Sequence, residues 1–459
     1  MRFRADVSLD VILLVCATAG RLLPGPGANL GFAVLALYAL RGNAQAVVAL
    51  AASWLFMMVN PGLVASTDVT LGRYLVIGAA AVSVLARSMS WNRKLTIQKT
   101  VLYTFGLGLA IVVHSLFFSA IVEVSLLKIL SWTTVMTTAL AAWAHMDRVE
   151  SARLGDGLRK ALVGVLLLSL PLAVMPVGYL RNSVGFQGVL NHPQPFGLLS
   201  GIVVAWSLAR AIRSPRPAWS LLVVIALAST FVVMSETRTA GVALVGGLAI
   251  VGMVLTITAK SEARRLPGLR SGRLLAVMGS VLIVSLFLWP AVSEGVTSFI
   301  TKRSAQTTVL DAYESSRGFL IREMLANIES RPLSGIGFGI ASSPSEMNVA
   351  RDALLGLPVS AAVEKGVAPL AWLEELGLFV FGAVVLWLVA LVRRALANGV
   401  EETTLLLVML AMNLGEAVLF SPGGMGLLML LLLGWAARPM HLANETTLNR
   451  GPLSRREFV

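Results

Sequence analysis

The stretches LLVVIALASTFVVM (residues 221–234) and VALVGGLAIVGMVLTI (residues 242–257) contain no charged side chain. A third stretch, LLMLLLLGW (residues 427–435), repeats the pattern near the C-terminal end. A helix of about 20 apolar residues is long enough to cross the hydrocarbon core of a bilayer. Backbone groups in lipid must hydrogen-bond internally, so solid apolar runs predict helices, whereas a barrel would alternate apolar and polar residues. These stretches predict a helical membrane protein.

The composition of the whole chain indicates the same class. Of the 459 residues, 56% are hydrophobic and 13% are charged, and the mean hydropathy is +0.81. Soluble globular proteins carry about 25% charged residues, so this composition excludes a soluble enzyme. A formal net charge of +13 would indicate nucleic acid in a soluble protein. In a membrane protein the positions of the cations first report sidedness, and we expect no nucleic-acid partner.

We therefore predict an all-α, polytopic membrane protein with about 14 transmembrane helices. The first apolar run begins near Val7 and resembles the start of a signal peptide. It lacks a convincing small-residue cleavage site, so we interpret it as the first membrane helix. The second and third spans are short. The predicted spans are 7–23, 28–41, 44–60, 69–86, 101–120, 124–143, 160–177, 194–212, 217–234, 239–258, 274–293, 367–392, 402–419 and 423–437.

The distribution of Lys and Arg predicts the orientation of these spans. If the N-terminus is cytoplasmic and the spans alternate, most cations lie in cytoplasmic segments, as the positive-inside rule requires. The short external segments and their flanks then hold five: Arg21, Arg73, Lys128, Arg181 and Arg238. Both termini are thus predicted to be cytoplasmic, and a large loop, 294–366, is predicted to be external between helices 11 and 12. Because no internal repeat is visible, residues 1–459 are predicted to form a single integral membrane domain.

Cysteine and histidine give no indication of a metal site. Cys16 is the only cysteine, and the four histidines are scattered without the close spacing that metal ligands need. We predict neither a metal nor a cofactor. The histidines are His114, His145, His192 and His441.

The long external loop is predicted to contain a short helix. Apolar residues recur at helical spacing after Ser316, and Pro332 stops the run. Arg317 shares a stripe with Met324 and Ile328, so it should face the protein, whereas a solvated Arg would lie on the opposite face. Arg317 is either a helix-edge residue beside a carboxylate or lipid phosphate, or an anion-binding residue at the mouth of a site.

Two further external arginines lie in polar, glycine-containing turns. Arg181 lies in the segment 178–193, and Arg238 lies in SETRTAG, residues 235–241. Charges at such junctions are costly unless they face a cavity or a partner. The alternatives are interfacial anchoring for Arg181, and an ion pair or snorkelling for Arg238.

Two candidate proton acceptors lie on the same side. His192 is followed by Pro193 and Pro195. It is either a structural turn residue or a base, since its ordinary pKa of about 6.5 suits proton transfer near neutrality. Glu364 and Lys365 end the long loop. Glu374 and Glu375 follow inside the next helix and require partners there, for which Arg is the natural choice.

Four segments, taken in order, resemble the superfamily of O-antigen ligases and O-antigen polymerases, which are bacterial membrane glycosyltransferases. They are GFQGVLNHPQPFG (185–197), SETRTA (235–240), Arg317 with RPLSGIGFG (331–339), and LAWLEELG (370–377). The resemblance covers roughly residues 170–440. The chain departs from the ligases where they have a His-Asn pair thought to supply the catalytic histidine, because Gly366 and Val367 occupy those positions.

The resemblance implies a metal-independent, inverting glycosyltransferase of the bacterial inner (plasma) membrane. Its donor would be a glycan on polyprenyl diphosphate at the outer face, and its product a surface polysaccharide such as O-antigen, capsule or exopolysaccharide. An O-antigen ligase, which transfers glycan to lipid A-core or another acceptor, is the alternative. Arg181, Arg238 and Arg317 would hold the diphosphate, because the guanidinium fork donates in pairs to phosphate oxygens. Glu364 or His192 would accept the proton of the acceptor hydroxyl.

A flippase or transporter of lipid-linked glycans is the main rival interpretation, because a similar number of helices is typical of transporters. Transporters place ionisable groups near the middle of the membrane. The candidates here are few: Glu123 with Lys128, and Glu416. A non-catalytic assembly component is a third possibility.

Overall fold

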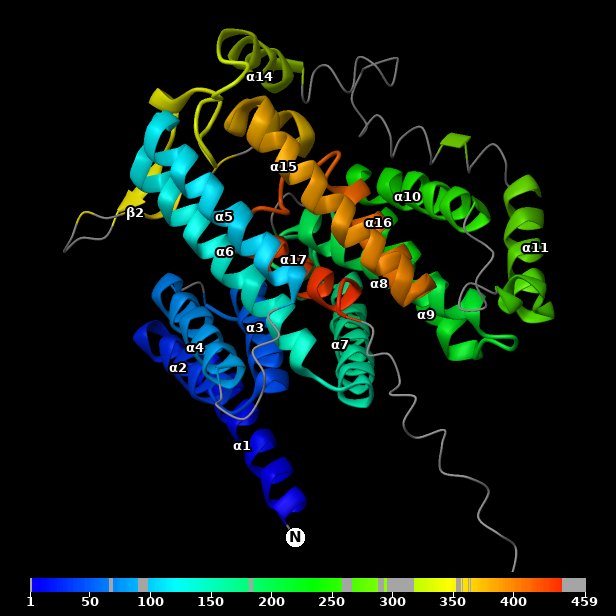
Figure 1. Ribbon diagram of the computed structural model, residues 1–459. Helices are drawn as coiled ribbons and strands as arrows, with labels where there is room; N and C mark the ends of the chain where they lie inside the picture. The colour runs from blue at the N-terminus through cyan, green and yellow to red at the C-terminus, as the bar shows by residue number, and fades with distance from the viewer. Residues whose placement is uncertain are drawn as a thin grey trace, which may run out of the picture.

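In the residues that the structure describes, the protein is all-α apart from one small hairpin, which confirms the all-α part of the predicted fold class (Figure 1). The computed structural model describes residues 2–65, 69–89, 98–180, 185–257, 266–287, 293–294, 318–351, 356, 358–361, 363 and 365–439. In chain order its helices are α1 (Arg2–Leu22), α2 (Ala28–Ala39), α3 (Asn43–Met58), α4 (Thr70–Ser88), α5 (Lys99–Phe118), α6 (Val122–His145), α7 (Arg148–Ser169), α8 (Pro193–Arg213), α9 (Trp219–Met234), α10 (Arg238–Ile257), α11 (Gly272–Phe287), α14 (Phe319–Ser330), α15 (Ala368–Asn398), α16 (Val400–Met412) and α17 (Gly424–Ala436). Strands β1 (Val349–Arg351) and β2 (Pro358–Ala361) form an antiparallel hairpin.

Each predicted span coincides at least in part with one of these helices, but several boundaries were wrong. Helix α7 begins at Arg148, well before residue 160, because Asp147 caps it: Glu150 N donates to Asp147 Oδ1 over 2.7 Å. Helix α16 ends at Met412, so the predicted span 402–419 leaves the helix partway. Asn413 stabilises the turn that follows, because its Oδ1 accepts hydrogen bonds from two backbone N–H groups downstream.

Seven helices in the described part of the chain are long and apolar enough to cross a membrane. They are α4, α5, α6, α7 with the 3₁₀ turn that extends it to Val174, α8, α10 and α15. Helices α2, α3, α9 and α17 are apolar but shorter. The total number of spans and their direction therefore stay predictions.

The outer surface of the bundle is apolar. On α5, a stripe of large side chains at least 47% exposed runs along one face: Leu102, Phe105, Leu109, Val113 and Leu116. Continuous apolar surface of this kind is disfavoured in water and marks contact with lipid or protein. The architecture is thus compatible with a polytopic protein embedded in a membrane.

Helix α17 lies at the centre of the bundle. Its residues Leu427–Leu433 are at most 1% exposed, as expected for a helix that is apolar on every side. With 13 residues it is only about 20 Å long, shorter than the hydrocarbon core of about 30 Å. Trp132 Nε1 donates to Leu419 O over 3.2 Å, and Trp143 Nε1 donates to Leu431 O over 3.1 Å, so α6 holds the region around α17 in place.

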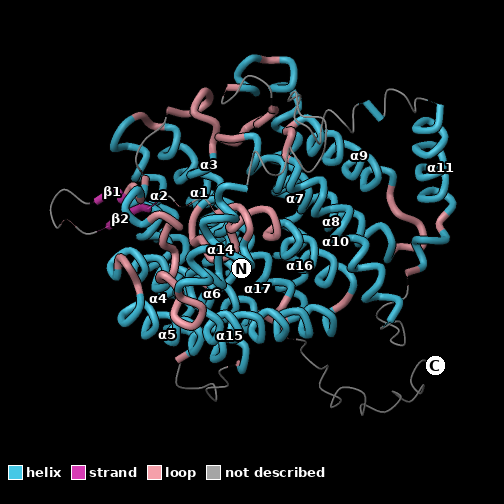
Figure 2. The backbone as a smooth tube through the Cα atoms, turned by 90° about the horizontal axis from the view of Figure 1, so that it is seen from above, coloured by secondary structure: helices cyan, strands magenta, loops and turns pink. Residues whose placement is uncertain are grey.

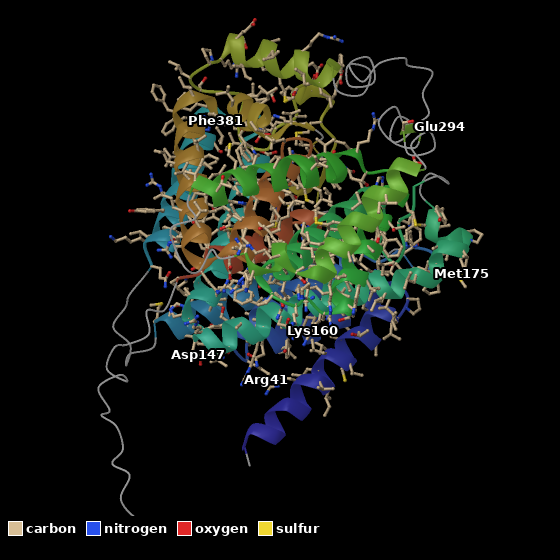
Figure 3. The ribbon with its side chains drawn as sticks, turned by 90° about the vertical axis from the view of Figure 1, so that its right-hand side faces the viewer. Arg41, Asp147, Lys160, Met175, Glu294 and Phe381 are labelled. Carbon is tan, nitrogen blue, oxygen red and sulfur yellow. The ribbon has the colours of Figure 1, made fainter. Side chains whose placement is uncertain are left out.

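The two ends of the bundle differ in chemistry. At one end, Asp156 of α7 forms ion pairs with Arg159, Lys160 and Arg210, which joins α7 to α8. Figure 3 places Lys160 and Arg41 toward the end at which α1 begins, and Glu294 toward the opposite end. Arg41 and Lys160, which were both predicted to be cytoplasmic, thus lie toward the same end of the bundle. Which end faces the cytoplasm stays a prediction.

The end opposite the start of α1 holds an arm, residues 318–361, that comprises α14 and the β hairpin. Figure 1 shows α14 above α15, and Figures 1 and 2 show the hairpin and α11 at opposite edges of the molecule. Arg351 of β1 pairs with Glu123 at the start of α6, and Tyr74 Oη of α4 donates to Val359 O of β2 over 3.3 Å. The arm is therefore joined to both α4 and α6.

Candidate functional site

Three of the five predicted site residues, Arg181, Arg317 and Glu364, lie outside the described residues. The predicted loop helix is present as α14, which begins at Phe319. Met324 is fully buried and Arg322 is exposed, so the two faces of this helix are those predicted.

His192 caps α8. Its Nδ1 accepts a hydrogen bond from Gln194 N over 3.1 Å, which satisfies one of the free N–H groups at the helix start. Its turn lies against the turn before α10, because Thr237 Oγ1 donates to Pro193 O over 3.2 Å and Phe186 N donates to Met234 O over 2.8 Å. The two polar turns that carry His192 and Arg238 are therefore neighbours in the fold.

The capping role of His192 gives a direct prediction. We expect His192→Ala to lower the free energy of unfolding by about 1 kcal/mol, because the cap is lost. His192→Asn should retain stability, since Asn is a good cap. Thermal unfolding measured on both variants checks the capping role: an Asn variant as unstable as the Ala variant would contradict it.

Arg238 is the first residue of α10 and follows a strained turn. Glu236 has φ = 53°, a conformation uncommon for any residue other than glycine. Thr239, the residue after Arg238, donates a hydrogen bond from its Oγ1 to Glu416 Oε1 over 3.0 Å. This contact joins the start of α10 to the loop 413–423 between α16 and α17.

The backbone hydrogen bonding of helix α15 is interrupted at Gly377, and the arm supplies the missing partners. Gly377 has φ = 65° and ψ = 174°, so its neighbours cannot form the usual helical hydrogen bonds. The segment RPLSGIGFG (331–339) supplies partners: Ile336 N donates to Glu374 O over 2.9 Å, and Gly337 N donates to Glu375 O over 3.0 Å. Leu378 N in turn donates to Pro332 O over 2.9 Å. The two segments that carry the family resemblance in this region therefore form one structural unit.

A buried ion cluster lies beside the break. Lys365 Nζ lies 2.6 Å from Glu374 Oε2 and 3.0 Å from Glu375 Oε1, and all three residues are at most 6% exposed. Asn327 Nδ2 of α14 donates to Glu374 Oε1 over 2.7 Å, and Gly339 N donates to Glu375 Oε2 over 2.6 Å. The expectation that an Arg would pair with these carboxylates was wrong, since their partner is Lys365. Lys365 lies just before the first turn of α15, so its ammonium can reach the carboxylates of both Glu374 and Glu375.

The cluster forms one wall of a cavity of about 360 Å³. Elements distant in the sequence meet here: α4, α6, the start of α15, β2 and the loop 413–423. Its ionisable lining residues are Arg73, Lys128, Lys365 and Glu375, and its aromatic ones are Tyr74, Phe338, Trp372 and Phe420. A concave site with a few converging polar groups among apolar walls is the usual form of a small-molecule site.

Arg73 and Lys128 are the functional candidates that sequence reasoning missed. Both were predicted to be external cations. Lys128 was considered only for the transporter alternative, and neither residue was assigned to the glycosyltransferase site. Lys128 Nζ donates to Gly339 O over 2.6 Å, and Gly339 has φ = 68°, where a Cβ would come within 2.4 Å of Lys128 Cδ. The scarcity of external cations was the signal that could have identified them.

The described residues contain no group of three or more His, Cys, Asp or Glu side chains that could hold a metal ion. Comparison of the chain with models of known protein families gives no match, and comparison with curated proteins gives none.

Proposed function

We propose that the protein is a glycosyltransferase of the bacterial inner membrane that uses a polyprenyl-diphosphate-linked glycan as donor. In this proposal about 14 spans cross the membrane, both termini are cytoplasmic, and the arm lies in the external loop. The reaction is most simply the polymerisation of a surface polysaccharide; transfer to a lipid A-core or another acceptor, as in an O-antigen ligase, is the alternative.

The observation that supports this function is the cavity between the arm and the bundle. Among the described residues it combines three cations with one carboxylate and aromatic walls, a lining suited to a charged, hydroxyl-rich ligand. It lies at the end of the bundle opposite the start of α1, where a lipid-anchored donor and a soluble glycan chain could both reach it. The loop 413–423 contributes to the cavity and also contacts the start of α10 beside Arg238.

The proposed chemistry is a single displacement. An oxygen of the acceptor hydroxyl bonds to the anomeric carbon, the bond from that carbon to the phosphate oxygen breaks, and polyprenyl diphosphate leaves. The acceptor proton passes to a base, for which Glu364 and His192 are the candidates. Arg181, Arg238 and Arg317 would stabilise the charge that develops on the diphosphate, as oriented donors do in many transfer reactions.

A transporter is less well supported by the contacts. Glu123 is 48% exposed and pairs with Arg351 of the hairpin, so it is a surface residue rather than a buried midplane group. Lys128 faces the cavity from the second turn of α6.

Arginine replacement tests the proposal. We expect Arg238→Ala and Arg317→Ala each to lower glycan transfer at least tenfold, because transition-state charge loses a donor. The assay uses the full chain, reconstituted in vesicles with a purified lipid-linked oligosaccharide. Arg322→Ala, on the exposed face of α14, is the matched control and should keep full activity.

The products of the same assay distinguish the alternatives. Longer glycan chains identify a polymerase, transfer to a new acceptor identifies a ligase, and translocation without transfer identifies a flippase. Unchanged transfer in both Arg238→Ala and Arg317→Ala would contradict the proposed diphosphate site.

A further inference from the structure

Among the described residues, three cations and one carboxylate line the cavity. Lys365 is balanced by Glu374 and Glu375, and these three groups together carry one negative charge. Lys128 and Arg73 add two positive charges at the same cavity. The described groups that line or back the cavity therefore leave an excess of one positive charge.

Arg73 is the cavity cation whose guanidinium can donate in pairs to an anion. Within the described part of the chain its guanidinium makes no ion pair, and its buried Nε has no hydrogen-bond partner. A buried donor without a partner costs about 1–3 kcal/mol, so its retention at a cavity wall calls for a ligand that satisfies it.

The position of this guanidinium is fixed by its surroundings. Its Cζ lies 4.6 Å from the centre of the Tyr74 ring, a cation–π distance, and Tyr74 is itself hydrogen-bonded to the hairpin. On the other side lies Gly423, where a Cβ would come within 2.5 Å of Arg73 Nη1. The guanidinium is thus preorganised, so binding an anion there needs little reordering of the side chain.

We propose that this cavity binds a sugar unit that carries a single negative charge, such as a uronic acid, and thereby selects an acidic glycan. The inference rests on the proposed glycosyltransferase function and names its substrate class. The guanidinium fork of Arg73 matches the two oxygens of one sugar carboxylate, and the aromatic walls of the cavity suit a sugar ring. The carboxylate is held by Arg73, which donates to it in pairs, and by Lys128, while Glu375 and Lys365 face the ring hydroxyls.

Binding of two disaccharides that differ in one group tests the inference. The first is a β-linked glucuronic acid–glucose disaccharide, and the second is its counterpart with the carboxylate reduced to hydroxymethyl. Titrated by calorimetry into the full chain in zwitterionic nanodiscs, the acidic probe should bind at least tenfold more tightly. Arg73→Gln and Lys128→Gln should each reduce this preference to less than threefold, and Arg73→Lys should retain part of it. Arg322→Gln is the control and should keep the preference.

Two outcomes would overturn the inference. One is equal affinity for the acidic and the neutral probe, or no binding of either. The other is tight binding of farnesyl diphosphate that is lost in Arg73→Gln, which would make the cavity the diphosphate site of the donor.

The reconstituted transfer assay separates the two proposals. Glycan transfer without any carboxylate preference leaves the proposed function in place and removes this inference. A carboxylate preference in a protein that transfers no glycan keeps the acidic-sugar site and removes the proposed function.

Discussion

Gly377→Ala is expected to prevent the protein from reaching its native packing, with a cost of more than about 4 kcal/mol. The conformation at Gly377, φ = 65° with ψ = 174°, belongs to a region essentially restricted to glycine. A Cβ there would also come within 2.1 Å of Leu333 O and 2.8 Å of Ser334 N, so the arm would have to leave the helix. We expect loss of the monodisperse peak in detergent size-exclusion chromatography and a large fall in the unfolding temperature.

The same helix offers a matched control. Gly382 lies one turn beyond the break, and a Cβ at that position meets nothing within 4 Å. Gly382→Ala should leave the protein folded and raise its stability by about 0.5–1 kcal/mol, because Ala favours the helix. A native-like unfolding temperature for Gly377→Ala would show that the arm does not need to dock at this break.

The second large effect is expected from the buried ion cluster. Lys365→Met removes the common partner of Glu374 and Glu375 and leaves both carboxylates without their counter-ion. Breaking a buried pair in this way costs about 3–5 kcal/mol, because an uncompensated charge stays in a medium of low polarity. The measurement is the midpoint of thermal or denaturant unfolding in detergent.

A double replacement and a surface pair complete the test. Adding Glu374→Gln to Lys365→Met removes one unpaired charge and should restore part of the lost stability. Arg351→Met breaks a pair whose side chains are 44% and 48% exposed, so it should cost at most about 1 kcal/mol. A similar small cost for Lys365→Met would mean that water or another cation reaches the cluster.

The helices could be predicted from the sequence because their signal is local. A solid apolar run such as residues 221–234 has few alternatives in lipid, and α9 is found there. Helix boundaries that are set by a single side chain were harder to predict from the sequence. Asn413 ends α16 by bonding the backbone several residues downstream, and such a contact competes with the helix in a way that hydropathy does not report.

The cavity could not be predicted in the same way, because its contacts join distant parts of the chain. Lys128 meets Gly339 across 211 residues, and Tyr74 meets Val359 across 285. The residue types at Arg73 and Lys128 are also those of ordinary interfacial anchors. Sequence patterns could identify the motifs 331–339 and 370–377 separately. Only the packing of the structure shows that the first motif supplies hydrogen-bond partners to the second.

The break in α15 has a consequence for how the protein assembles. Backbone groups left unpaired in lipid cost several kcal/mol each, and here they are satisfied by a segment that precedes the break by about forty residues. After membrane insertion alone, the backbone groups beside Gly377 in α15 would therefore lack hydrogen-bond partners. Its first turns become complete only when the arm docks, and the segment that makes these contacts also lines the cavity through Phe338 and Gly339.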